Sequence, residues 1–289
     1  MENTQNAGLN GTPVIKPKVY PAIKNSIILC LLLIWMQFVV SFVFTIFQLI
    51  FSLADVSLFM GINSILTSLI SFGIILLIGF IRTKRKFNEV FKFNKVSPLL
   101  WVSTTVFIIG FIILSSELDN LVSYILPMPE FFRTIFESLT AGQTFIFSTI
   151  SVAIIPAFTE ELLFRGVILD GLTRNYSKRK AILISALLFG LIHLNPWQFV
   201  TAFLIGLVSA WICIETNSIL LSIFIHFFNN ALYTIAMNYR DKIAVRGFNN
   251  YSPAEIEFQP LWFNAAGLVL LIIGTIMLVQ GIKKIKTPA

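Results

Sequence analysis

Residues 145–172 read FIFSTISVAIIPAFTEELLFRGVILDGL, and this stretch places charged residues inside an otherwise apolar segment. Residues 145–158 carry no charge, whereas Glu160, Glu161 and Arg165 follow within six positions. A charged side chain at the centre of a membrane helix costs about 2.5–3.5 kcal/mol on insertion scales. Packing alone does not explain three such groups, so the stretch predicts a membrane helix that carries a reactive site.

The composition of the whole chain is typical of a polytopic membrane protein. Of its 289 residues 56% are hydrophobic and only 12% are charged, and the mean hydropathy is +0.85. The net charge of +7 does not indicate a nucleic-acid partner, because the basic residues stand in short clusters between apolar runs. Cys30 and Cys213 lie in apolar segments without a metal-binding spacing, so we interpret them as small buried hydrophobes.

Apolar segments separated by polar loops predict an all-α bundle of about eight transmembrane helices. The segments lie at about 26–53, 58–81, 99–115, 142–164, 181–194, 197–214, 218–237 and 261–282. All except the fifth are near or above the length that crosses about 30 Å of hydrocarbon. The fifth is short and ends at Asn195-Pro196, so we expect it to stop below the far surface.

The predicted organisation is a tail, a membrane domain and a second tail. The N-terminal cytoplasmic tail covers 1–25, and the eight-helix membrane domain covers 26–282, with its catalytic core at about 142–237. A basic cytoplasmic tail covers 283–289. No internal repeat and no second domain is apparent.

The basic residues divide unevenly between the two sides of this bundle. With the N-terminus inside, sixteen of the 21 Lys and Arg residues fall in inside segments and one, Arg165, falls within a span. The four outside residues are Arg133, Arg240, Lys242 and Arg246. Because Lys and Arg are retained in cytoplasmic loops, we expect a multi-pass protein of the plasma (inner) membrane with both termini cytoplasmic.

The same topology places polar residues from three segments at one depth. Glu160, His193 and His226 lie eleven to fourteen residues from charges at the inside ends of their spans. These intervals correspond to about 16–21 Å of helix rise. The three side chains should therefore converge on one site.

The spacing within the fourth segment divides the roles of its acids. Glu161 and Arg165 are four residues apart and share a helix face, so we expect them to form a structural ion pair. Glu160 is rotated from Glu161 by about 100°, which leaves it free to accept a proton. Pro156 cannot donate a hydrogen bond to the carbonyl of Val152 and should kink the helix near the acid.

The two histidines of the chain complete the candidate site. His193 follows Phe189 by four, and Asn230 follows His226 by four, so each pair shares a helix face. A neutral imidazole can act as a base or a metal ligand, and an amide can donate to an oxyanion. Glu160, His193 and His226 also match a zinc-ligand set in type and number. Zinc is thus a candidate cofactor, although no His-Glu-x-x-His spacing occurs.

Three patterns resemble the motifs of the CPBP family, the CAAX-processing and bacteriocin-processing (Abi) intramembrane proteases. They are Glu160-Glu161-x-x-x-Arg165, Phe189-x-x-x-His193 and His226-x-x-x-Asn230, within roughly residues 156–235. The resemblance implies an eight-helix bundle that cuts peptide bonds at the membrane. It implies that Glu160 and His193 activate the attacking water and that His226 and Asn230 stabilise the oxyanion. Family members are usually called metalloproteases, but the resemblance does not decide whether a metal is bound.

Two other classes of function use the same residues. The first is a non-catalytic bacteriocin-immunity or scaffold membrane protein, and the second is a transporter, which the lack of an inverted repeat disfavours. The expected partners are the lipid bilayer and a membrane-associated peptide or protein substrate, with no nucleic acid. The substrate stays open between a prenylated CAAX tail, a leader peptide and a membrane-protein segment. The Phe-, Ile-, Lys- and Asn-rich composition resembles that of an AT-rich bacterium, where prenylation is not expected.

Overall fold

The computed structural model describes residues 18–51, 56–132, 134, 145–239, 242, 244–249 and 256–286, and every regular element in these ranges is helical. The first half contains α1 (Ile23–Phe51), α2 (Val56–Thr83), α3 (Phe87–Val90) and α4 (Pro98–Ile125). A helical run follows, composed of α6 (Phe145–Ser148), η1 (Thr149–Ile154), α7 (Ile155–Glu161), η2 (Leu162–Ile168) and α8 (Leu169–Asn175). The last helices are α9 (Lys178–Leu191), α10 (Pro196–Thr216), α11 (Leu220–Asn238) and α12 (Leu261–Lys286).

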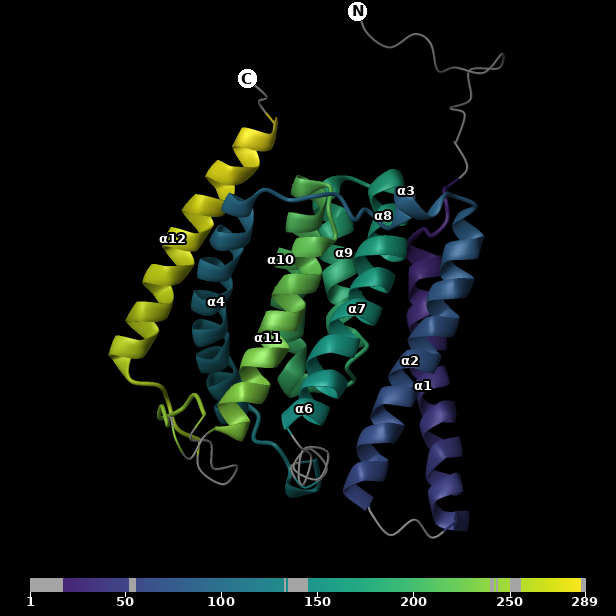
Figure 1. Cartoon of the computed structure of the whole chain (residues 1–289), viewed down its shortest axis with the longest axis horizontal. Coiled ribbons are helices and arrows are strands. Elements are labelled where there is room, and N and C mark those ends of the chain that lie inside the picture. Colours follow the sequence, from purple (N-terminus) through teal and green to yellow (C-terminus); the bar gives the residue numbers. More distant parts are fainter. Residues whose placement is uncertain are drawn as a thin grey trace, which may run out of the picture.

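The long helices stand side by side as one bundle (Figure 1). In the described residues, five helices are long and apolar enough to cross a membrane. They are Ile23–Phe51, Gly61–Thr83, Pro98–Ile125, Pro196–Thr216 and Leu261–Lys286. The remaining apolar segments form the helical run 145–175 and the shorter helices α9 and α11. The expectation of an all-α polytopic membrane protein is confirmed.

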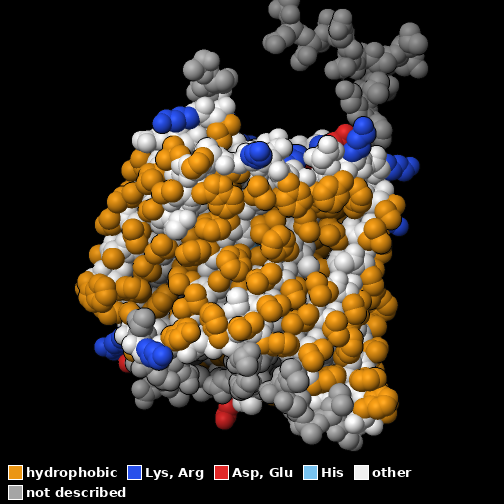
Figure 2. All heavy atoms as spheres, viewed as in Figure 1, with side chains coloured by type: hydrophobic (Ala, Val, Ile, Leu, Met, Phe, Trp, Pro, Cys, Tyr) orange, Lys and Arg blue, Asp and Glu red, His pale blue; other side chains and the backbone are white. Residues whose placement is uncertain are grey.

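Charge and apolar surface separate along the bundle axis. Figure 2 shows a broad band of hydrophobic side chains with Lys and Arg at both ends and the larger share at the upper end, where α1 begins and α12 ends. The first and last described helices thus meet the same end, here called the basic end, as an even number of crossings requires. That this end faces the cytoplasm stays a prediction. Lys16, Arg133 and Arg240, which entered that prediction, lie outside the described residues.

Helix α4 is longer than its hydropathy indicates. The sequence suggested an apolar segment that ends near residue 115, but the helix continues to Ile125. The polar residues of the extension have partners: Glu117 Oε1 accepts from Asn264 Nδ2 of α12 at 3.1 Å, and its Oε2 accepts from Asn120 Nδ2 at 3.0 Å. Because these contacts satisfy the polar groups, the helix does not need to end where they begin.

Glycines bring the backbones of α4 and α12 into direct contact. A Cβ atom on Gly110 would lie 2.4 Å from the backbone nitrogen of Leu271, and one on Gly274 would lie 2.4 Å from the backbone of Phe107. Small residues at such crossings allow the close approach that packs helices in a membrane. This pair of helices forms one edge of the bundle (Figure 1).

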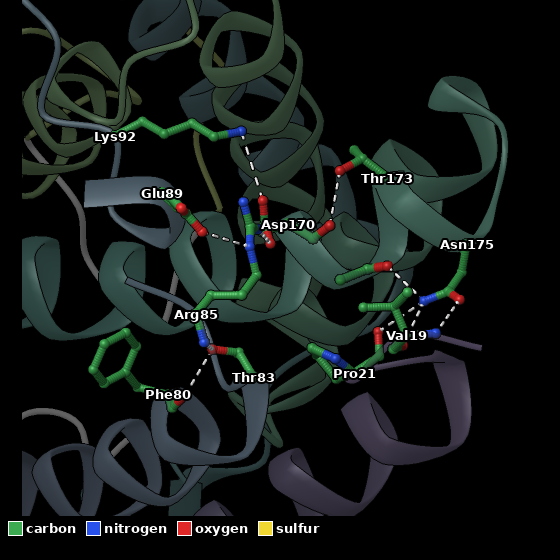
Figure 3. Close-up of polar contacts among 11 residues, drawn as sticks. Val19, Pro21, Phe80, Thr83, Arg85, Glu89, Lys92, Asp170, Thr173 and Asn175 are labelled. Carbon is green, nitrogen blue, oxygen red and sulfur yellow. Dashed lines mark hydrogen bonds and ion pairs between the residues drawn. The ribbon is translucent and has the colours of Figure 1, made fainter. Parts of the chain in front are cut away.

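The helical run 145–175 is held at the basic end by an ion-pair cluster (Figure 3). Asp170 of α8 is buried and forms ion pairs with Arg85 and, at 3.7 Å, with Lys92, both from the loop between α2 and α4. The pKa of Arg85 lies above its usual value chiefly because the guanidinium donates to Asp170. Asp170 therefore fixes this loop against the end of the helical run.

The segment before α1 is attached to the same end of the run. The side-chain amide of Asn175 accepts from the backbone N–H of Val19 at 2.9 Å and donates to the carbonyls of Val19 and Gly171 at 2.7 Å each. A Cβ atom on Gly171 would lie 2.2 Å from Cδ of Pro21, so only glycine permits this approach. Figure 3 shows these residues on the opposite side of α8 from Arg85.

Candidate active site

Both acids of the first motif lie on a short α-helical piece between two π-helical segments. Helix α7 carries Glu160 and Glu161, with η1 (Thr149–Ile154) before it and η2 (Leu162–Ile168) after it. π-helical turns are rare and frequently occur at functional sites, because they shift the register of side chains along a helix. The local irregularity thus surrounds the residues that the sequence singled out.

Pro156 leaves a carbonyl that another helix satisfies. The carbonyl oxygen of Val152 would bond the N–H at position 156 in a regular α-helix, and proline has none. Nδ2 of Asn230, from α11, donates to this oxygen at 2.9 Å. Asn229 Nδ2 in turn donates to Oδ1 of Asn230 at 3.0 Å, which orients the amide. Asn230 therefore ties α11 to the irregular part of the motif helix.

The expected contact between Glu161 and Arg165 is present and has a third member. Arg165 Nε lies 3.0 Å from Glu161 Oε2, and both side chains are fully buried. This contact is electrostatic rather than a directed hydrogen bond. Nδ1 of His226 lies 3.1 Å from the other oxygen, Oε1, of Glu161. Glu161 therefore links its own helix to α11, and it leaves Nε2 as the ring nitrogen of His226 that can meet a substrate.

The ring of Phe189 lies at the centre of the cluster. The guanidinium carbon of Arg165 lies 4.5 Å from its centroid, in cation–π geometry. The rings of His193 and His226 approach it edge-on, with centroids at 5.3 and 5.5 Å. The aromatic residue of the second motif thus contacts one residue from each of the three motifs.

Glu160 and His193 form fewer polar contacts than Glu161 and His226. Oε2 of Glu160 is buried and accepts no hydrogen bond from the described residues. His193 is half-buried in the turn after α9, and its Nδ1 lies 2.8 Å from the carbonyl oxygen of Phe189. Because a carbonyl only accepts, Nδ1 carries a proton, and Nε2 is the ring nitrogen that can hold a lone pair. Oε2 of Glu160 and Nε2 of His193 thus have no hydrogen-bond partner among the described residues.

The described residues do not gather a metal-ligand set. No three His, Cys, Asp or Glu side chains among them are arranged to hold a metal ion. This includes Glu160, His193 and His226, the candidates for a zinc set. The neighbouring acid, Glu161, is already engaged by Arg165 and His226. The arrangement of these described residues therefore does not fit a metal ion.

The sequence pattern predicts the acids and the histidines as candidates and the ion pair as a contact, but it carries no local signal for two contacts that organise them. The contact between His226 and Glu161 joins residues 65 positions apart, and the contact between Asn230 and Val152 joins residues 78 apart. For Phe189, the sequence contains one indication of its contacts: it precedes His193 by four residues and so shares a helix face with it.

Comparison with known proteins identifies the segment that carries this cluster. Residues 142–232 match the family model described as type II CAAX prenyl endopeptidase Rce1-like. No curated protein and no solved structure matches the chain. The matched segment contains all three motifs, so the resemblance to the CAAX protease family is confirmed. It implies an intramembrane endopeptidase activity, carried by an integral, multi-pass membrane protein.

Proposed function

We propose that this protein hydrolyses a peptide bond of a membrane-associated protein or peptide, with a water molecule activated by Glu160 and His193. The observation that carries the proposal is the unequal engagement of the two adjacent acids. Glu161 is held by Arg165 and His226, whereas Oε2 of Glu160 is buried without a hydrogen-bond partner among the described residues. In this proposal Glu161 has a structural role, and the adjacent Glu160 is the acid that takes part in the reaction.

In this mechanism Glu160 or Nε2 of His193 takes a proton from water, and the oxygen attacks the carbonyl carbon of the substrate. The carbonyl oxygen becomes a tetrahedral oxyanion, and the proton passes to the leaving amine as the C–N bond breaks. Nε2 of His226 lies on the ring edge away from Glu161. Because Nδ1 donates to that carboxylate, Nε2 would donate to the oxyanion as the second N–H of an imidazolium, whose charge Glu161 balances. The amide of Asn230 has a second N–H beyond the one given to Val152, so it can still donate.

The surroundings of the site limit the class of substrate. The cluster lies on helices of an apolar bundle, so the scissile bond must reach it from within the bilayer or from its surface. We propose a protein or peptide attached to or spanning the membrane, and a plasma-membrane location with both termini cytoplasmic. A prenylated tail, a leader peptide and a membrane segment all meet the requirement.

The test compares Glu160→Gln with Asp119→Asn in the purified full-length protein. Gln is nearly isosteric with Glu but cannot accept a proton, so cleavage of a membrane-tethered peptide library should fall by about 10²–10⁴-fold. Asp119 is also an acid within a membrane helix, but it contacts Thr201 of α10 and none of the motif residues. Its variant should retain cleavage within about two-fold. Mass spectrometry of the products gives both the rate and the cleavage position.

Three outcomes separate the proposal from its rivals. Loss of activity in Glu160→Gln, with gel filtration and thermal stability unchanged, supports Glu160 as the base. Equal rates in the two variants would contradict the division of roles between the acids. A wild-type protein that cleaves nothing, yet binds a partner equally well after Glu160→Gln, would favour the scaffold function.

A further inference from the structure

A hollow of about 680 Å³ lies at the basic end of the bundle, away from the candidate active site. Its wall is formed by the segment before α1 and the start of that helix, and by Tyr176 after α8 and the first turn of α9. The lining includes Lys18, Lys24, Ile27, Ile28, Tyr176 and Lys180. The hollow thus joins the first membrane helix to the end of the helical run that carries the motif acids.

The rim of the hollow concentrates positive charge around one aromatic ring. The ammonium groups of Lys18 and Lys180 lie 5.3 and 5.2 Å from the ring centroid of Tyr176. Lys24 adds a third cation, and no acidic residue lines the hollow. Within the part of the chain that the structure describes, none of these three lysines forms an ion pair. The charges are therefore left for a ligand.

The lower part of the hollow is apolar and open. Ile27 and Ile28 are 41% and 38% exposed and lie on α1 one turn after its first residue, Ile23. Tyr176 is fixed above them, because its hydroxyl accepts from the backbone N–H of Ile23 at 3.4 Å. Lys24 precedes Ile27 and Ile28 by three and four residues on α1, so cation and apolar surface follow each other along one helix face. This is the order in which a phospholipid presents its phosphate and its acyl chains.

We infer that this hollow binds an anionic glycerophospholipid from the adjacent leaflet, with the phosphate among Lys18, Lys24 and Lys180 and the chains against Ile27 and Ile28. Basic pockets between membrane helices bind anionic head groups in this way. The tendency of Lys and Arg to remain on one side of the membrane explains a positive end. This tendency does not explain why Lys18 and Lys180 both contact the ring of Tyr176 beside exposed isoleucines.

The ligand also bears on the position of the motif helix. Tyr176 directly follows Asn175, which ties the end of α8 to the segment before α1. A lipid bound across α1 and the connection between α8 and α9 should hold these elements together. We therefore expect bound anionic lipid to raise the thermal stability of the protein.

The experiment uses the full chain in neutral detergent, with phosphatidylglycerol, phosphatidylcholine, inorganic phosphate and glycerol 3-phosphate as probes. Native mass spectrometry counts the bound lipid, and a melting curve gives the stabilisation. The test variant is Lys18→Gln/Lys180→Gln. The matched control is Lys95→Gln/Lys284→Gln, which removes two exposed lysines at the same end but outside the hollow.

Each lysine near an anionic surface is worth roughly a five-fold factor in affinity. Phosphatidylglycerol should therefore bind the test variant roughly 25-fold more weakly than the wild type. It should bind the control within about two-fold, and phosphatidylcholine should bind weakly to all three. Should the double variant fail to fold, the inference is tested by phosphatidylglycerol binding to Lys180→Gln alone and by comparing the binding of the two lipids to the wild-type protein.

Two results would overturn the inference. Equal loss in the test and control variants, or equal binding of the two lipids, would mean that the hollow has no special affinity for the anionic head group. Displacement of phosphatidylglycerol by millimolar inorganic phosphate or glycerol 3-phosphate would assign the hollow to a free phosphate ester instead of a lipid.

Discussion

Replacing Arg165 by Met removes the cation that Glu161 faces while it keeps a side chain of similar length. Both side chains are fully buried, and the guanidinium also lies 4.5 Å from the ring of Phe189. Removing one partner of a buried pair costs about 3–5 kcal/mol, because the remaining charge is left without compensation. For a chain of this size such a loss lowers the melting temperature by about 6–20 °C.

The double-mutant cycle with Glu161→Gln isolates the pair. Glutamine removes the charge but keeps an oxygen that can accept from Nδ1 of His226, so the contact to α11 is preserved in part. Arg165→Met should then be less costly in the Glu161→Gln background than in the wild type, by about 1–3 kcal/mol. The readout is thermal or denaturant unfolding of the full-length protein in detergent.

Additive losses of stability in the double variant would contradict a coupled buried pair. A melting temperature of Arg165→Met within about one degree of the wild type would contradict it equally. Either result would mean that Glu161 finds its compensation elsewhere, and the role of the buried guanidinium would have to be reassigned.

Three further predictions test the positioning, the topology and the chemistry. Gly171→Ala should destabilise the protein by about 1–3 kcal/mol in a melting assay, because its Cβ would overlap Pro21. The control Gly73→Ala should be neutral or stabilising, because no atom lies within 4 Å of the added Cβ. Reporter fusions after Lys95 and after Lys286 should both score as cytoplasmic, and an external signal from either would contradict the assigned orientation. Because Glu160, His193 and His226 are not arranged as a metal-ligand set, a chelator should leave the rate of peptide cleavage within about two-fold of the untreated rate. Loss of cleavage on chelation, with recovery on adding zinc, would show that the histidines are zinc ligands.

The features that the sequence determined are those encoded locally. Long apolar runs require helices in a bilayer, because only a helix satisfies its own backbone there. The spacing of four between Glu161 and Arg165 puts them on one face whatever surrounds the helix, and the structure has them 3.0 Å apart. The three motifs likewise pointed to the family that residues 142–232 match.

Only the tertiary structure determines which polar groups of separate helices form hydrogen bonds with each other. The length of α4 was underestimated because hydropathy treats Glu117 as an exposed charge, whereas Asn264 of α12 provides its hydrogen-bond donor. The proposed oxyanion-stabilising roles of His226 and Asn230 depend on His226 reaching Glu161 and on Asn230 reaching the carbonyl freed by Pro156. Such contacts follow from how α11 packs on the helical run. Local periodicity fixes the face that a residue occupies, but the packing of separate helices fixes what that face touches.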